Sequence, residues 1–517
     1  MVNRESGPPH KPVPGNPYAQ PTPPATGGGG RGRGILLGAA ALTLVLVGAG
    51  TYALTRDDGD GSREPVAAAS KDASDGGPSA TPERDTEAQD DGKAAVIDVN
   101  AGRKPGEAKA WLAMNEIKLP GKGARLYDPW RVPGIVAQAE HNEVTGYRTT
   151  TGKQAWTVPL PGEVCDTPVN PTPDGKVVVA YTERESEQNK KCDQLQVIDL
   201  KSGAKGWHKP LVATGTMDDT SMTTLAISGG AVVVNQDMIV RAYRISDGKR
   251  LFTAEREKEG GCYATGVAGG ARLLEVGSCG VTDDTTRGRL RKLDPRTGDV
   301  KWRYWTKKGW NIQKVYSVDP VVVAVKNRED MDKWAVVAVD DKGKERSWTR
   351  LDKGPEEIEM CAGAGDSGEG MQNCPGAAVA KDRIYLESKP TGGDVIGPNR
   401  VVAFDLAKGK RLWGAEVKGK GQLTPVAASG GDRPGVIVYA RAWVDKTGQT
   451  LRIGPDGGKP EVLLRHTEAA RPIEVDMTVG YTLYAEDRLF VSPSSLEGKN
   501  NGTAGEEGNP RMLSFGR

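Results

Sequence analysis

The sequence predicts an all-β fold: an eight-bladed β-propeller of four-stranded antiparallel blades, or a seven-bladed one, preceded by one transmembrane helix. Three observations lead to this prediction. An aromatic residue recurs about every fifty residues after a glycine turn, and an uncharged apolar segment lies near the N-terminus. The chain also has 68 Gly and 34 Pro, with a hydrophobic fraction of only 37%. This composition suits many short strands joined by turns better than long helices.

The N-terminal region predicts a membrane anchor. Residues 1–33 are rich in Pro and Gly and lack apolar periodicity, which indicates a disordered cytoplasmic tail; a polyproline II ligand for a cytoplasmic partner is the alternative. Residues 34–55 form the predicted transmembrane helix, because the 21 residues from Gly34 to Leu54 carry no charge and can cross a bilayer. Arg33 precedes this segment and Asp57 follows it, so the positive-inside bias places the N-terminus in the cytoplasm and the remainder outside the plasma membrane.

A cleaved signal peptide is the alternative interpretation of the same segment. The apolar run is longer than the apolar region of a typical signal peptide, and no Cys lies at its end to carry a lipid. Residues 56–93 are acidic and almost free of large apolar side chains, which predicts a flexible linker. Residues 94–517 then form the propeller, with each blade built from one copy of a repeat.

The repeat is a strand that ends near an Asp, a turn with Gly, and an aromatic residue four or five positions after that Gly. Asp199 and Gly203 lead to Trp207 in this way. The Gly supplies a positive φ and the Asp accepts hydrogen bonds from turn amides, while the aromatic ring covers the gap between neighbouring blades. The structural repeat aromatics are Trp111, Trp156, Trp207, Phe252, Trp302, Trp348 and Trp413, and Leu463 holds the same position in a degenerate copy. Their spacings of 45 to 65 residues are typical of four-stranded blades.

The first repeat copy predicts how the ring closes. Trp111 lies so near the linker that two preceding strands do not fit before it. Tyr481–Ala485, Arg488–Ser492 and Met512–Phe515 can supply the missing strands, so one blade would combine both chain ends and leave no free sheet edge. The weak copy near Gly458 leaves seven blades as the alternative. Two further aromatic residues, Trp130 and Trp443, lie off the repeat position and are expected at the surface or facing a ligand.

The strand–Asp–x–x–x–Gly–Lys–x–x–Trp unit resembles the PQQ-type propeller repeat, over about residues 94–517. This repeat occurs in quinoprotein alcohol dehydrogenases and in non-enzymatic relatives, so the resemblance implies the fold and leaves the function open. The family's alcohol dehydrogenases stack PQQ between a Trp and a ring of two adjacent cysteines, beside Ca²⁺ held by Glu, Asn and Asp. This sequence has no adjacent cysteines and no C-x-x-C-H haem signature. We therefore expect no catalytic residue, metal or cofactor, although PQQ with calcium is what the resemblance would imply.

Six cysteines all lie in the predicted extracytoplasmic part of the chain, where an even number favours disulfides. Each successive pair falls within one repeat unit. The predicted bridges are Cys165–Cys192, Cys262–Cys279 and Cys361–Cys374. Between the last two cysteines, residues 363–368 match both G-x-G-x-x-G and the GDSG of serine-protease loops. A dinucleotide loop needs a strand–helix context that is missing here, so a disulfide-closed flexible loop is the expectation.

These observations favour a membrane-anchored, non-catalytic binding or scaffolding module. The alternatives are a quinoprotein dehydrogenase and a single-pass signalling receptor that reads an external ligand. The expected partners are the plasma membrane, through residues 34–55, and a protein or small-molecule ligand that the sequence does not identify. A net charge of only +2 spread over 517 residues provides no dense basic patch for nucleic acid.

Overall fold

The computed structural model describes residues 97–115, 117–183, 191–213, 223–254, 261–280, 282, 285–362, 370–372, 374–391, 397–417, 419, 421–477, 480–498 and 509–517, all within the compact part Gln89–Arg517. The predicted tail, transmembrane helix and linker lie outside these residues, as do residues 363–368. Within the described ranges, no helix is long and apolar enough to cross a membrane. The single helix found there is α1, Arg471–Asp476.

The described part of the chain is all-β, and its strands form four-stranded antiparallel units, numbered here in chain order. Unit 1 contains β3 (Trp130–Val132), β4 (Ile135–Glu140), β5 (Glu143–Arg148) and β6 (Gln154–Pro159). Unit 2 contains β7 (Val164–Asp166), β8 (Lys176–Tyr181), β9 (Gln194–Asp199) and β10 (Lys205–Pro210). Unit 3 contains β11 (Thr223–Ser228), β12 (Ala231–Gln236), β13 (Ile239–Arg244) and β14 (Arg250–Ala254). Unit 4 contains β15 (Tyr263–Ala268), β16 (Leu273–Cys279), β17 (Arg287–Leu293) and β18 (Val300–Trp305).

The remaining units follow the same plan. Unit 5 contains β19 (Trp310–Val318), β20 (Val321–Asn327), β21 (Trp334–Val339) and β22 (Glu345–Arg350). Unit 6 contains β23 (Ala377–Val379), β24 (Arg383–Glu387), β25 (Val401–Asp405) and β26 (Arg411–Ala415). Unit 7 contains β27 (Leu423–Ser429), β28 (Gly435–Ala440), β29 (Gln449–Gly454) and β30 (Gly457–Arg465). Unit 8 contains β31 (Gly480–Ala485), β32 (Arg488–Pro493), β34 (Pro510–Gly516) and β1 (Lys109–Met114), and a short extra pair joins β2 (Ala124–Arg125) to β33 (Ser495–Leu496).

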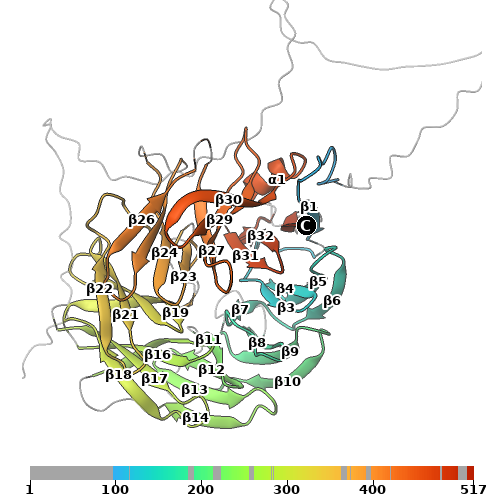
Figure 1. Ribbon diagram of the computed structural model, residues 1–517. Helices are drawn as coiled ribbons and strands as arrows, with labels where there is room; N and C mark the ends of the chain where they lie inside the picture. Colours follow the sequence, from blue (N-terminus) through green and yellow to red (C-terminus); the bar gives the residue numbers. More distant parts are fainter. Residues whose placement is uncertain are drawn as a thin grey trace, which may run out of the picture. The chain divides into compact units, whose positions relative to one another are not determined.

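The units follow one another around a centre in a propeller-like arrangement (Figure 1). The first strand of a unit lies innermost, as β7, β11, β19 and β27 do in Figure 1, and the fourth lies at the outer rim. Units 4 and 5 share one continuous eight-stranded sheet through a single parallel pair, Arg287 with Trp310. The weak repeat copy near Gly458 forms a complete sheet, unit 7, so the strands support eight units rather than seven.

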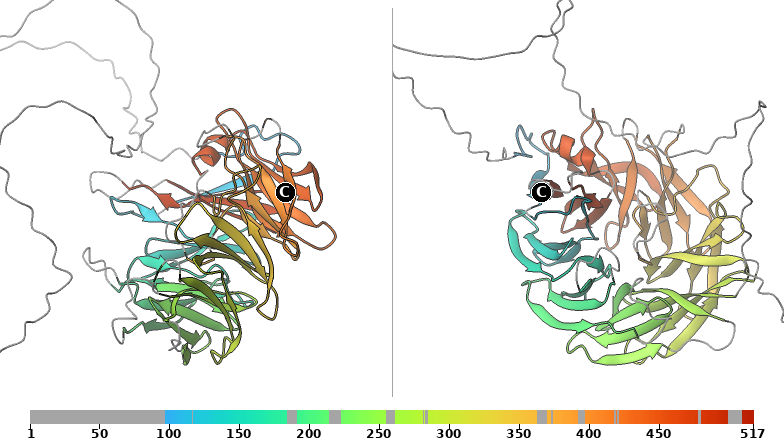
Figure 2. Two further views of the ribbon diagram at one scale, coloured as in Figure 1. Left: turned by 90° about the vertical axis from the view of Figure 1, so that its left-hand side faces the viewer. Right: turned by 180° about the vertical axis from the view of Figure 1, so that it is seen from behind.

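Unit 8 confirms that both chain ends build one sheet. Its strand order is β31, β32, β34, β1, so the first described strand pairs with the last one. Lys109 lies opposite Gly516 and Leu112 opposite Leu513. Figure 2 shows from behind how the blue start of the described chain meets the red end.

The repeat turns use Asp and Gly for the reasons that the sequence indicates. The Asp405 carboxylate accepts hydrogen bonds from the backbone N–H groups of Ala407 and Lys408, both at 2.7 Å. These bonds hold the pKa of Asp405 below its usual range. In the equivalent turn, Gly203 has a φ of 74°, which side chains rarely tolerate.

The turn glycine also seats the aromatic ring of the preceding unit. A Cβ atom on Gly203 would lie 2.8 Å from the Trp156 ring, and one on Gly298 would lie 2.6 Å from the Phe252 ring. The contacts of this kind are Trp111–Gly152, Trp156–Gly203, Trp207–Gly248, Phe252–Gly298, Trp302–Gly343 and Trp413–Gly457. The absence of a side chain on the glycine therefore lets each ring lie flat across the boundary between two units.

Trp348 departs from this arrangement. Trp348 lies five residues after Gly343, whereas the spacing is four residues for the boundary aromatics Trp156, Trp207, Phe252, Trp302 and Trp413. Because side chains alternate between the faces of a strand, the extra residue turns Trp348 away from the next unit. Ser347 occupies the boundary instead and donates a hydrogen bond to the Leu406 carbonyl at 2.7 Å. Trp348 packs edge-on against Trp310 of its own unit, with ring centroids 5.2 Å apart.

The expectation for Trp130 was wrong. Its side chain is only 1% exposed, and its indole N–H donates to the Pro168 carbonyl at 2.7 Å. Trp443 is half-buried. The Leu463 side chain packs against the apolar cluster that contains Val99 and Ala108, where the ring closes.

Candidate functional site

The two faces of the propeller-like body differ in their connections. Consecutive strands are antiparallel, so the connections from the second to the third strand, and from one unit to the next, emerge on the same side. We call this side the loop face. Between described strands its connections include 182–193, 351–376, 388–400, 441–448, 466–479 and 494–509. On the opposite side, the longest connection is 167–175.

All three disulfides lie at the loop face. The bonded pairs are Cys165–Cys192, Cys262–Cys279 and Cys361–Cys374, the same pairs as predicted, and no described cysteine is free. Cys165–Cys192 and Cys262–Cys279 each tie a loop-face connection to a strand of the same unit, whereas Cys361–Cys374 closes a loop within the connection 351–376. The crosslinks therefore constrain the face whose backbone is least constrained by sheet hydrogen bonds.

The centre of the ring contains a small hollow with room for about one water molecule. Its walls come from the innermost parts of four consecutive units: Tyr127 and Asp128 before β3, Asp166 in β7, Leu225 in β11 and Val267 in β15. Asp166 accepts a hydrogen bond from the Leu225 N–H at 2.6 Å. The Tyr127 hydroxyl donates to the Val164 carbonyl at 2.7 Å.

The hollow is bordered on its remaining side by Gly370, Met371 and Gln372, which belong to the connection between units 5 and 6. We call these three residues the strap. The strap crosses the centre of the ring, because its neighbours in the hollow come from units 1 to 4.

Hydrogen bonds hold every residue of the strap. The Gly370 carbonyl accepts from Lys314 Nζ at 3.0 Å, and the Met371 carbonyl accepts from the Val315 N–H at 2.8 Å. The Gln372 carboxamide accepts from the Gly269 N–H at 2.6 Å and donates to the Gly269 carbonyl at 3.0 Å. A Cβ on Gly266 would lie 2.7 Å from Met371 Cε, so that glycine makes room for the methionine.

The central residues do not fit PQQ with calcium. A planar cofactor needs a flat floor and open space above it, whereas the strap and its hydrogen bonds take up part of the centre. The ring of adjacent cysteines that forms this floor in quinoprotein alcohol dehydrogenases has no counterpart in the sequence. In the part of the chain that the structure describes, no group of three His, Cys, Asp or Glu side chains could hold a metal ion.

Glu387 is a buried carboxyl at the base of the long connection that carries the strap. Its side chain accepts from Asn399 Nδ2 at 3.0 Å, and a Cβ atom on Gly376 would lie 3.1 Å from its second oxygen. Burial raises the pKa of Glu387 to about 7, because the Arg441 guanidinium only partly compensates for lost solvation and Glu359 adds repulsion.

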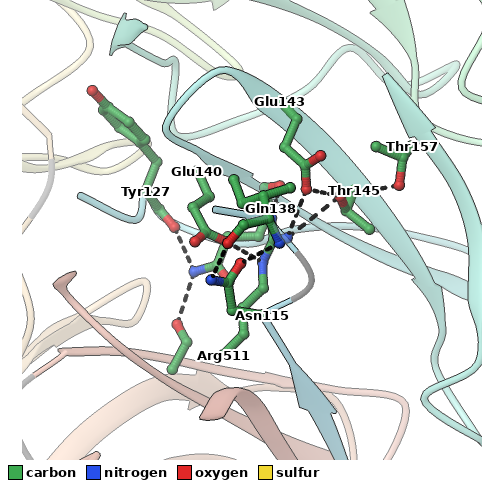
Figure 3. Close-up of polar contacts among 10 residues, drawn as sticks. Asn115, Tyr127, Gln138, Glu140, Glu143, Thr145, Thr157 and Arg511 are labelled. Atoms are coloured by element: carbon green, nitrogen blue, oxygen red, sulfur yellow. Dashed lines mark hydrogen bonds and ion pairs between the residues drawn. The ribbon is translucent and has the colours of Figure 1, made fainter. Parts of the chain in front are cut away.

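A buried ionic cluster joins unit 8 to unit 1 (Figure 3). Arg511, on β34, lies 2.9 Å from Glu140 and 3.0 Å from Glu143, which flank the β4–β5 turn. It also donates to the Gln138 carbonyl at 3.1 Å. All these side chains are almost fully enclosed. Burial raises the pKa of Glu140, and the Arg511 guanidinium opposes that shift.

The second boundary of unit 8 contains a hydrogen-bonded chain of Tyr439, Glu474 and His466. Glu474 Oε1 accepts from the Tyr439 hydroxyl at 2.8 Å and lies 2.7 Å from His466 Nδ1. The His466 ring stacks on Phe515 at 3.7 Å. The His466 and Glu474 side chains are 0% exposed, so this His–Glu pair cannot reach a substrate and serves the packing of unit 7 against unit 8.

The fold and its repeat define a PQQ-like β-propeller protein. A family model described as outer membrane protein assembly factor BamB matches residues 91–261 and 253–443. These matches cover more than half of the chain, which therefore belongs to this family. No curated protein matches the chain in sequence.

Similar solved structures include a BamB protein and two dehydrogenases. BamB from Moraxella catarrhalis is 14% identical and has a TM-score of 0.42, with 78% of this chain and 99% of that chain covered. A europium-containing methanol dehydrogenase is 11% identical with a TM-score of 0.44, over 79% and 94% of the two chains. The quinohemoprotein alcohol dehydrogenase from Comamonas testosteroni is 14% identical with a TM-score of 0.42, over 79% and 77%. At these values the likenesses do not distinguish between functions.

The strap is the central feature that the sequence patterns did not reveal. One signal was present: Gly266 lies inside the strand β15 and Gly269 lies just beyond its end. A glycine within a strand often marks the close approach of another segment. The pattern does not say which segment approaches, since Gln372 lies 103 residues further along the chain than Gly269.

Proposed function

We propose that the chain is a non-catalytic binding or scaffolding module: an eight-bladed propeller, held outside the cytoplasm by residues 34–55, that binds a protein partner through its loop face. The difference between the two faces carries this proposal. Long connections on a rigid ring are the usual location of binding residues, and here they are crosslinked by three disulfides.

The positions of exposed apolar side chains also favour the loop face as the binding surface. Among the described residues, the three most exposed large hydrophobic side chains are Val444, Val212 and Met331, at 68%, 66% and 53%. All three belong to loop-face connections. Met331 also borders an open groove of about 1660 Å³ between units 5 and 6, together with Trp334 and Glu359. Apolar surface with a polar rim is typical of protein-binding sites, and we propose the groove at Met331 as the place of such a contact.

Site-specific photocrosslinking of the full chain in its native membrane tests the binding face. A benzoylphenylalanine at Met331 or Val444 should give a discrete adduct of higher mass on irradiation. The same residue at Leu412, an exposed position on the outer strand β26, is the matched control and should give none. Adducts at Leu412 alone, or at none of the loop-face positions, would contradict the proposed face.

The non-catalytic part of the proposal has its own test. The purified full chain is incubated with PQQ and Ca²⁺, dialysed, and assayed with a panel of alcohols and an artificial electron acceptor. We expect no retained PQQ and no turnover above background. Stoichiometric PQQ or measurable turnover would instead establish a quinoprotein dehydrogenase.

A further inference from the structure

The strap depends on a disulfide that differs from the other two in exposure. Cys361 and Cys374 are both half-buried, so solvent reaches both ends of this bridge. In contrast, Cys262 and Cys279 are 1% and 5% exposed, and the Cys165–Cys192 bridge has one half-buried end, Cys165, and one buried end, Cys192, which is 5% exposed. A thiolate must approach a sulfur directly to open a disulfide, so accessibility decides which bridge reacts first.

The bridge also determines how firmly the strap can stay in the centre. Cys374 lies two residues after Gln372, and the bridge joins two cysteines 13 positions apart, with the strap between them. A short closed loop loses little entropy when it docks. Once the bridge is open, the covalent closure is lost and the ends of the segment are held together by the hydrogen bond from the Ala362 N–H to the Pro375 carbonyl at 2.8 Å. Docking of the strap then costs more conformational entropy.

We propose that Cys361–Cys374 is a redox-controlled latch: an external dithiol reduces it, the strap leaves the centre of the ring, and the hollow opens. In the first step a thiolate of the dithiol attacks one sulfur of the bridge, the S–S bond breaks and a mixed disulfide forms. The second thiol of the dithiol then displaces the protein sulfur. Two electrons and two protons pass to Cys361 and Cys374, which become thiols, and the dithiol becomes a disulfide.

If the bridge opens and the strap leaves, the polar groups that now form hydrogen bonds with the strap would be exposed. The N–H groups of Gly269 and Val315, the Gly269 carbonyl and Lys314 Nζ all lose a partner when the strap leaves. The hollow beside them contains Tyr127 and Asp166. This inference concerns the centre of the ring and does not depend on the proposed loop-face partner.

The test uses the full oxidised chain in detergent micelles, titrated with dithiothreitol. Differential alkylation identifies which cysteines become thiols, and hydrogen–deuterium exchange follows the peptides that contain Gly269 and Val315. We expect Cys361 and Cys374 to react at the lowest dithiothreitol concentration. Exchange at Gly269 and Val315 should then accelerate by about tenfold or more, as for amides that lose their hydrogen bonds by local opening.

Two variants separate the latch from general destabilisation. The double variant Cys361→Ser with Cys374→Ser should show the fast exchange without reductant, whereas Cys165→Ser with Cys192→Ser should leave exchange at Gly269 and Val315 unchanged. With all bridges intact, Gln372→Ala should accelerate hydrogen exchange at Gly269 more than at Val315. The substitution removes only the hydrogen bonds of the Gln372 carboxamide, and these are made with Gly269.

Two results would overturn the latch. One is that Cys165–Cys192 or Cys262–Cys279 opens before Cys361–Cys374. The other is that exchange at Gly269 and Val315 stays slow after Cys361 and Cys374 have been alkylated. The wild-type titration decides the question even if the serine variants fail to fold.

Discussion

A glycine and an aromatic ring meet at six boundaries between neighbouring units. The glycine provides the turn with a positive φ, and its missing side chain provides the flat surface on which the ring lies. Three of the tryptophans add a hydrogen bond: the indole N–H groups of Trp111, Trp207 and Trp413 donate to Thr149, Ile245 and Pro455 carbonyls at 2.7 to 2.8 Å. One spacing in the sequence thus specifies a turn and a contact between units.

Trp302 allows this contact to be measured. The Trp302→Ala variant should lose about 3–5 kcal/mol of unfolding free energy, because it empties a large buried site against Gly343. Trp305→Ala is the matched control: Trp305 is half-exposed on the same strand and contacts Arg287 over its ring. The Trp305→Ala variant should lose about 1 kcal/mol of unfolding free energy or less. Chemical denaturation of both variants checks this, and equal losses would show that the boundary contact is not special.

Glu387 should make stability depend on pH. Its pKa is about 7 in the folded chain against 4.5 as a usual value. The folded state therefore binds this proton more tightly, and the resulting stability is present below about pH 4.5 and is lost as pH rises through 7. This difference in pKa corresponds to about 3 kcal/mol of unfolding free energy.

The matched variant is Glu387→Gln, which keeps an acceptor for Asn399 and cannot ionise. Between pH 4.5 and pH 8, the wild type should lose about 3 kcal/mol relative to this variant in urea unfolding. Parallel stability curves for the two proteins would mean that Glu387 ionises normally.

At the scale of elements, β34 links the end of the chain to its first sheet. Arg511 lies between Glu140 and Glu143 with almost no solvent. Removing one member of such a buried ionic group costs more than the group contributes, because the remaining charges stay buried without a partner.

A double-mutant cycle should show this coupling. Arg511→Met should destabilise the protein by about 3–5 kcal/mol. Adding Glu140→Gln should recover at least about 1 kcal/mol, because it removes an unpaired charge. Unfolding free energies of the single and double variants provide the measurement, and strictly additive losses would contradict a shared cluster.

The repeat made much of the fold predictable from the sequence. The features that it did not predict were missed for physical reasons. The two-ended unit followed from counting strands, since Trp111 needs three partners and only the C-terminus supplies them. Trp348 was misplaced because a spacing of four or five residues was accepted, although one residue reverses the face of a strand. The strap and the Arg511 cluster join residues more than 100 and 350 positions apart, and no local pattern encodes such pairings.

At the scale of the whole molecule, the topology across the membrane remains a prediction. A reporter enzyme that is active only outside the cytoplasm, fused after Arg517, should be active, because Arg31 and Arg33 precede the apolar segment and the acidic linker follows it. The mature protein should also keep its N-terminus. N-terminal sequencing checks this, and a mature form that begins near Arg56 would indicate a secreted protein without an anchor.

The pairing of β1 with β34 has a consequence for biogenesis. Within the described strands β1 has no other partner, and roughly 400 residues separate Met114 from Pro510. At translation rates of about 5–20 residues per second, β1 would wait some 20–80 seconds for its neighbour. During this interval seven units can form, yet the ring stays open with an unsatisfied strand at each end. Newly made chains therefore pass through a stage in which two edges are free to pair with another chain, and a holdase chaperone would have most to protect at that stage.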